Sequence, residues 1–155
     1  MSDNFFAHES VVRPEWIDHN GHMNVGYFVI AFDEATDAVY ERWGIGLRYP
    51  DETGCSVFTL GMNVDYLAEL FAGDPLRIET LLVDYDHKRI HYFHRMFHRD
   101  SNKLAATNEC LCMNVELASR KSAPFPPAVL ENLDQARCEG IAPEGVGRSL
   151  AIRRR

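Results

Sequence analysis

An acidic side chain, Asp18, stands in a short polar turn directly before a segment with strong helical periodicity. Gly21 lies between the acid and that segment, where it lets the backbone approach a ligand closely. The unpaired amides of a helix start can hold an anion or a developing oxyanion, and a neighbouring carboxylate can act as a base or a nucleophile. This spacing therefore indicates a catalytic site. The alternative is that Asp18 and Asn20 only form the turn and cap the helix.

The composition excludes several functions. A chain of 155 residues with 46% hydrophobic content fits one domain with a substantial core. The formal net charge of -7 argues against a nucleic-acid partner, because phosphate binding needs a basic surface and the dense basic run is confined to 153–155. A neutral or cationic substrate suits this charge. The first residues show neither a basic leader nor a long apolar segment, and Cys110 and Cys112 point to the same face of one predicted strand. We therefore expect a cytoplasmic protein with reduced thiols and no membrane segment.

A long amphipathic helix is predicted over residues 24–43. Its apolar side chains recur at three- and four-residue steps and form one broad stripe: Val25, Phe28, Val29, Phe32, Ala35, Val39 and Trp43. The acidic residues lie largely on the other side: Asp33, Glu34, Asp37 and Glu41. Gly44 and Gly46 end the helix.

Strand character is predicted for five segments, and a short helix for a sixth. In chain order these are strands 8–12, 56–66, 75–84, 89–98 and 104–117, then the helix 128–138. Polar turns separate the later strands, so neighbours should pair as antiparallel hairpins. We expect an α+β fold in which an antiparallel sheet of about five strands wraps around the long central helix, because that buries one face of each. The domain would span 1–139, and 140–155 would form a Gly/Pro-containing basic tail.

The order of strand, Asp-x-Asn-Gly-His loop, long helix and antiparallel strands resembles the hotdog fold, as found in acyl-CoA thioesterases related to 4-hydroxybenzoyl-CoA thioesterase. The resemblance covers about residues 11–127 and rests on Asp18, 20–24, 28–33 and 70–80. It implies that Asp18 is the catalytic carboxylate and that the following helix directs its start at a thioester carbonyl. It also implies a homodimer or a dimer of dimers with the active site between subunits, and no cofactor.

The expected reaction is hydrolysis of an acyl-CoA thioester. Asp18 would either activate a water molecule or attack the carbonyl to form a mixed anhydride, and the sequence leaves both routes open. Backbone amides near Met23 and Val25 would stabilise the oxyanion. His22 could orient the acid or hold substrate, and Asn24 could hold the loop or contact the thioester.

Three segments most resemble thioesterases of carnitine and betaine breakdown, namely 16–24, 35–38 and 88–94. This resemblance implies betainyl-CoA as a candidate substrate, whose acyl group carries a quaternary ammonium. Such a cation favours aromatic faces and nearby carboxylates. The aromatic candidates for the acyl pocket are Trp16, Trp43, Tyr49, Phe58 and Tyr66, and the alternative for each is core or interface packing.

The phosphates of CoA need cations at the mouth of the site. Arg89, Arg120 and Lys121, with Arg148 as a further candidate, stand at predicted strand ends or in loops. Ordinary solvated surface charge is the alternative for each. The histidines do not predict a metal site, because four residues along a strand separate His94 from His98 by about 13 Å.

A second hypothesis is a non-catalytic hotdog protein that binds an acyl-CoA or another small ligand. It is supported by Gly61, because the carnitine-related resemblance implies a carboxylate near that position and a glycine stands there instead. A hydratase of the same fold fits less well, since that chemistry needs an Asp/His dyad in a different loop pattern.

Overall fold

The computed structural model describes residues 5–140, 142–147 and 150–155. The elements follow in this order: β1 Phe5–Val11, the 3-10 helix η1 Pro14–Trp16, α1 Val25–Trp43, α2 Tyr49–Thr53, β2 Cys55–Tyr66, β3 Pro75–Tyr85, β4 Arg89–His98, β5 Lys103–Glu116, β6 Lys121–Ser122 and α3 Pro127–Ala136.

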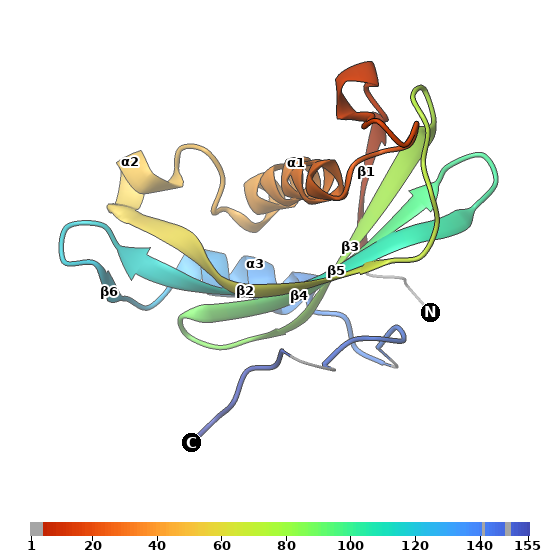
Figure 1. Ribbon diagram of the computed structural model, residues 1–155. Helices are drawn as coiled ribbons and strands as arrows, with labels where there is room; N and C mark the ends of the chain where they lie inside the picture. The colour runs from red at the N-terminus through yellow and green to blue at the C-terminus, as the bar shows by residue number, and fades with distance from the viewer. Residues whose placement is uncertain (1–4, 141, 148–149) are drawn as a thin grey trace.

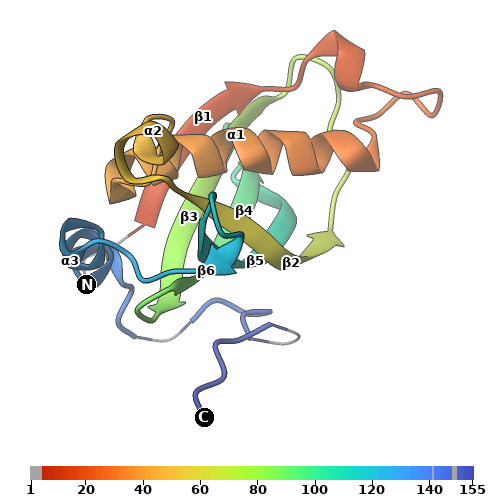
Figure 2. The ribbon, with the colours of Figure 1, turned by 90° about the vertical axis from the view of Figure 1, so that its left-hand side faces the viewer.

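The five long strands form one antiparallel sheet in the order β1-β3-β4-β5-β2, and the short β6 pairs with the end of β5. Figures 1 and 2 show this sheet curving around α1, which lies across its concave face. The predicted α+β arrangement is confirmed. Because β1 and β2 are the outer strands of this order, each has one edge that no long strand covers.

The ends of α1 are set by its own flanking residues. Asn24 adopts extended backbone angles as the N-cap and accepts the Gly26 amide with its side chain, and Gly44 ends the helix in the left-handed region. Most of the predicted apolar stripe is buried against the sheet. Val29 is only partly buried, and Val25 has 59% of its surface exposed at the helix start.

Two elements differ from the sequence-based expectation. No element was predicted between the helix 24–43 and the strand 56–66, but this segment contains α2, where Tyr49 is buried and its hydroxyl donates to Asn114 Oδ1 at 2.7 Å. β1 begins at Phe5 rather than at residue 8, because β3 supplies pairing partners as far as Leu81. Both differences arise from contacts between segments far apart in the sequence, which local patterns do not show.

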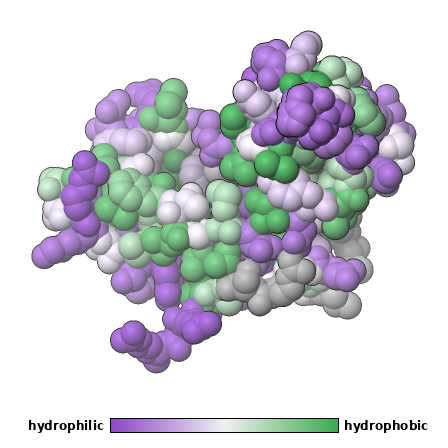
Figure 3. Space-filling model, in the orientation of Figure 1, coloured by the Kyte–Doolittle hydropathy of each residue, from purple (hydrophilic) through white to green (hydrophobic). Residues whose placement is uncertain are grey.

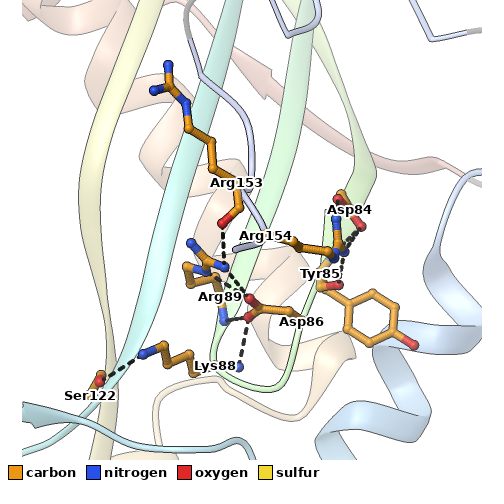
Figure 4. Close-up of polar contacts among 8 residues, drawn as sticks. All are labelled: Asp84, Tyr85, Asp86, Lys88, Arg89, Ser122, Arg153 and Arg154. Carbon is orange, nitrogen blue, oxygen red and sulfur yellow. Dashed lines mark hydrogen bonds and ion pairs between the residues drawn. The ribbon is translucent and has the colours of Figure 1, made fainter.

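The C-terminal segment, residues 142–147 and 150–155, runs along the face of the sheet opposite α1 (Figures 1 and 2). Its last residues bind the β3–β4 end of the sheet (Figure 4), where the Arg154 guanidinium contacts the Asp84 carboxylate at 2.8 and 2.9 Å. Further back, the Gly147 amide donates to the buried Glu109 carboxylate on β5. None of the described helices is long and apolar enough to cross a membrane.

Candidate active site

The loop between η1 and α1 is folded back on itself by backbone hydrogen bonds. The Asp18 amide donates to the His22 carbonyl at 3.1 Å, and the Met23 amide donates to the Leu70 carbonyl at 2.7 Å. Gly21 turns the chain between them with φ +84°, a conformation that is costly for a residue with a side chain. The loop is thereby held at a defined position against the connection from β2 to β3.

The Asp18 carboxylate is held by two N–H donors beside the start of α1. Its Oδ1 accepts the Asn20 amide at 2.8 Å, and its Oδ2 accepts the side-chain amide of Asn24 at 3.2 Å. The Asn20 hydrogen bond, reinforced by Asn24 and by the nearby His22 and His19, outweighs desolvation and lowers the pKa of Asp18 below its ordinary value of 3.8. Asp18 is therefore ionised at neutral pH, in the state needed to accept a proton or to attack a carbonyl.

The first helical residue, Val25, offers an open backbone amide. No described residue accepts a hydrogen bond from it, which is expected at the first position of a helix. The Gly26 amide, in contrast, is donated to the Asn24 side chain at 3.0 Å. The Met23 amide already donates to the Leu70 carbonyl in the β2–β3 connection, so it is not a free oxyanion donor as predicted. Val25 remains.

A hollow of about 270 Å³ adjoins the helix start and the end of β2. Tyr66 lines it and donates its hydroxyl to the Val25 carbonyl at 3.0 Å. His22 also lines it, with Nε2 3.8 Å from the Glu69 carboxylate. Four of the predicted site residues thus line one hollow at the start of α1: His22, Met23, Val25 and Tyr66.

The two tryptophans proposed for an acyl pocket are core residues. Trp16 is 2% exposed and stacks on Tyr27, and Trp43 is 3% exposed and packs edge-on against Tyr92. Trp43 borders a small cavity, but at the C-terminal end of α1, away from Asp18. The indole rings are buried because their large apolar surface gains free energy when it is removed from water. This corrects the prediction for both residues.

The three cations predicted to bind CoA lie at the end of the sheet remote from Asp18 of the same chain. The Asp18 loop adjoins the start of β3, whereas Arg89 follows the end of β3. The 11 residues of β3 separate these two ends by about 30 Å. Arg89 is also engaged, since its guanidinium contacts the Asp86 carboxylate at 2.6 Å and the Arg153 carbonyl at 3.3 Å (Figure 4).

Arg120 is exposed in the turn before β6. Lys121, the exposed first residue of β6, pairs with Glu116 at the end of β5. That is again the end remote from Asp18. A single chain therefore does not bring these cations to the carboxylate, and only a second subunit could. Arg148 lies outside the described residues.

A second and larger cavity, of about 590 Å³, opens between the second half of α1, α2 and β2. Its lining includes carboxylates on one stripe of α1 and two tyrosines: Asp33, Asp37, Glu41, Tyr40 and Tyr49. The sequence patterns predict no site at this position, apart from Tyr49 as an aromatic candidate for the acyl pocket. The available signal was the four-residue spacing of the acids, which by itself indicates only a solvated helix face. The cavity exists because α2 and β2 are placed against that face.

Comparison with known proteins identifies the family. The model of the thioesterase-like superfamily matches residues 12–133, which include the Asp18 loop, α1 and the strands β2 to β5. The chain belongs to this superfamily. It is a thioester hydrolase of the acyl-CoA thioesterase class, and the predicted hotdog fold is confirmed.

Individual thioesterases resemble the chain over most of its length. A betainyl-CoA thioesterase of Pseudomonas aeruginosa is 34% identical over 98% of both chains. An L-carnitine dehydrogenase/betainyl-CoA thioesterase of Agrobacterium fabrum is 33% identical over 90% of this chain, which corresponds to 29% of that longer protein. Among solved structures, a hypothetical protein from Staphylococcus aureus in complex with CoA has a TM-score of 0.86 at 30% identity and covers 96% of both chains.

Proposed function

We propose that this thioesterase hydrolyses betainyl-CoA to the free acid and CoA, with Asp18 as the catalytic carboxylate and with each active site shared by two subunits. The observation that carries the proposal is the juxtaposition at the start of α1. An ionised carboxylate lies beside a helix start that presents an open amide at Val25.

In the proposed reaction, Asp18 and the start of α1 act on the thioester carbonyl. Asp18 either removes a proton from the water molecule that attacks the thioester carbonyl, or attacks that carbon itself to give a mixed anhydride that water then hydrolyses. In both routes negative charge develops on the carbonyl oxygen, where the Val25 amide and the positive end of the α1 dipole stabilise it. The CoA sulfur leaves as thiolate and is protonated to the thiol.

The proposed dimer is formed by the free edge of β2. This strand is 12 residues long, and its exposed apolar side chains include Phe58 at 39%, Leu60 at 53% and Met62 at 44%. Figure 3 shows hydrophobic surface over the part of the molecule where β2 crosses in Figure 1. A long apolar strand edge with unpaired backbone groups favours pairing with a second strand. We assign that partner as β2 of a second copy, because a two-fold axis makes one strand edge complementary to itself.

This pairing would also explain the location of the predicted CoA-binding cations. Antiparallel pairing brings the start of β2 in one subunit beside the end of β2 in the other. Lys121 lies near the start of β2, because it pairs with Glu116 and Glu116 pairs with Cys55. Arg120 and Lys121 of one subunit would then approach the end of the molecule that carries Asp18 of the other, where phosphate groups of CoA could bind them.

The assignment of betainyl-CoA is supported by the relatives and by the charge of the chain. Two of the relatives described above are named for betainyl-CoA, and the formal net charge of -7 suits an acyl group that carries a fixed positive charge. The four cysteines are free thiols, which supports the cytoplasmic location expected from the sequence.

The test is steady-state hydrolysis of a panel of acyl-CoAs that includes betainyl-CoA, measured by release of free thiol. We expect turnover of betainyl-CoA with a kcat/KM above that of acetyl-CoA and butyryl-CoA. Asp18→Asn should lower kcat at least about 100-fold while leaving the fold and the dimer intact. Retention of full activity by Asp18→Asn would refute the catalytic assignment, and binding of acyl-CoA without any hydrolysis would favour the non-catalytic alternative.

A further inference from the structure

The larger cavity lies between the second half of α1, α2 and β2, whereas Asp18 precedes the start of α1 and does not line the cavity. We propose that it is the acyl-group pocket for the Asp18 of the partner subunit, and that its carboxylates and Tyr40 select an acyl group bearing a quaternary ammonium. This inference rests on the proposed thioesterase function and on the β2-to-β2 dimer. It assigns a specificity-determining role to Asp33, Asp37 and Glu41, which the sequence patterns place only on the polar side of the central helix.

The charge of the cavity fits a fixed cation. Asp33, Asp37 and Glu41 follow one another at intervals of four residues along α1, so their side chains are neighbours on one face. Glu41 is partly satisfied, since its Oε1 accepts the Leu47 amide at 2.6 Å. Neither Asp33 nor Asp37 forms an ion pair with any other described residue. Burial and the two neighbouring acids raise the pKa of Asp37, because three like charges repel one another in the absence of a cation.

The aromatic walls fit a cation that cannot donate hydrogen bonds. Tyr40 and Tyr49 line the cavity, but their hydroxyls are already engaged, Tyr40 with Tyr92 at 3.1 Å and Tyr49 with Asn114 at 2.7 Å. These bonds fix the rings. A trimethylammonium group needs aromatic surface and diffuse negative charge rather than hydrogen-bond acceptors at short range. The partly exposed ring of Tyr40 and the acids of α1 supply these, whereas Tyr49 is 4% exposed and contributes little surface.

The position of the cavity is consistent with a role in the active site of the partner subunit. α1 and β2 run in opposite directions. The start of α1 lies at Tyr66, the last residue of β2, and the second half of α1 lies near the first residues of β2, where Ser56 and Val57 line the cavity. A two-fold axis near the middle of β2, at Leu60, therefore sets the two α1 helices antiparallel. The start of one helix, with its Asp18, then faces the cavity of the other subunit.

A matched pair of substrates tests the charge selection. Betainyl-CoA and 3,3-dimethylbutyryl-CoA have acyl groups of nearly the same shape, and only the first is charged. We expect the wild-type protein to prefer betainyl-CoA, and Asp37→Asn to lower kcat/KM about tenfold for betainyl-CoA with little change for the neutral analogue. The control is Asp51→Asn, which removes one exposed carboxylate of α2 that does not line the cavity. It should leave the preference intact.

Equal losses on both substrates, or no loss on either, would overturn the assigned selection. Hydrolysis of the neutral analogue with no preference for betainyl-CoA in the wild-type protein would do the same while leaving the thioesterase function standing. Absence of hydrolysis with every acyl-CoA would instead refute the proposed function itself. The two failures are therefore distinguishable.

A mixed dimer tests whether the cavity acts across the interface. One subunit carries Asp18→Asn and the other Asp37→Asn, each with a different affinity tag for isolation of the heterodimer. If Asp18 works with the cavity of the partner, one of the two sites is fully wild type, and activity on betainyl-CoA should be about half of the wild-type value. If Asp18 works with the cavity of its own chain, no wild-type site forms. Activity would then not exceed half that of the Asp37→Asn homodimer, which would refute the proposed arrangement.

Discussion

The Asn24 side chain joins Asp18 to the start of α1. Its Nδ2 donates to Asp18 Oδ2 at 3.2 Å, while its Oδ1 accepts the Gly26 amide at 3.0 Å as the helix cap. One residue thus orients the candidate catalytic carboxylate and fixes the helix end whose amide faces the same region. The two roles can be separated, because a shorter residue can still cap the helix but cannot donate to the Asp18 carboxylate.

Asn24→Ala should lower both stability and activity. Loss of the cap costs about 1 kcal/mol of unfolding free energy, and loss of the donor to Asp18 should lower kcat/KM about tenfold. Asn24→Ser is the matched variant, since its hydroxyl can cap the helix but is too short to reach the carboxylate. It should retain stability in urea unfolding while showing the kinetic loss. Wild-type kinetics for Asn24→Ser would show that the bond to Asp18 has no part in turnover.

The acid side of the pH–rate profile should not show the ionisation of Asp18 near neutrality. The Asn20 amide keeps the pKa of Asp18 below 3.8, so the carboxylate remains charged throughout the range in which the protein is assayed. We expect kcat/KM on betainyl-CoA to show no loss from Asp18 protonation between pH 8 and about pH 5. The measurement is a pH profile with stability followed in parallel. A carboxylate-dependent limb within that range would contradict the geometry at the loop.

Asp37→Asn should raise stability while it reduces selectivity. Burial, with Asp33 and Glu41 nearby, raises the pKa of Asp37 in the folded chain above its value when unfolded. The folded state then binds more protons between those two pKa values, so ionisation of Asp37 lowers stability as pH rises through that interval. Removing the charge should increase Tm at pH 7, and the difference should shrink as pH is lowered toward 4. An unchanged or lower Tm at pH 7 would contradict this prediction.

Leu60→Lys should convert the dimer into monomers and abolish activity. Leu60 is 53% exposed at the middle of β2, and a lysine there places a charge on each side of the proposed two-fold axis. Analytical ultracentrifugation and the thiol-release assay should show both losses together. Ala7→Lys, on the exposed face of the other edge strand β1, is the control and should change neither. A monomeric but fully active Leu60→Lys protein would contradict a site shared between subunits.

The central helix and the reactive loop were predictable because short-range determinants specify them. Asn24 caps α1 through the neighbouring Gly26, and Gly44 ends the helix by its own conformational freedom. The link between Asp18 and Asn24 spans only six residues. Polar turns between alternating segments set the antiparallel strands, so the sheet was also predicted with small errors at the strand ends.

The remaining site features depend on the meeting of distant segments. Met23 was predicted as an oxyanion donor, but its amide binds Leu70, and Trp16 was predicted for a pocket but lies in the core. By sequence, the acids of α1 indicate only a solvated helix face, whereas in the structure they line a cavity that α2 and β2 form beside that face. The amino-acid sequence by itself thus determined the helix, the strands and the acid at the turn, because those depend on neighbours along the chain. The tertiary structure decided which amides stay open, which aromatic rings are buried and where a cavity forms, because each depends on residues brought together by folding.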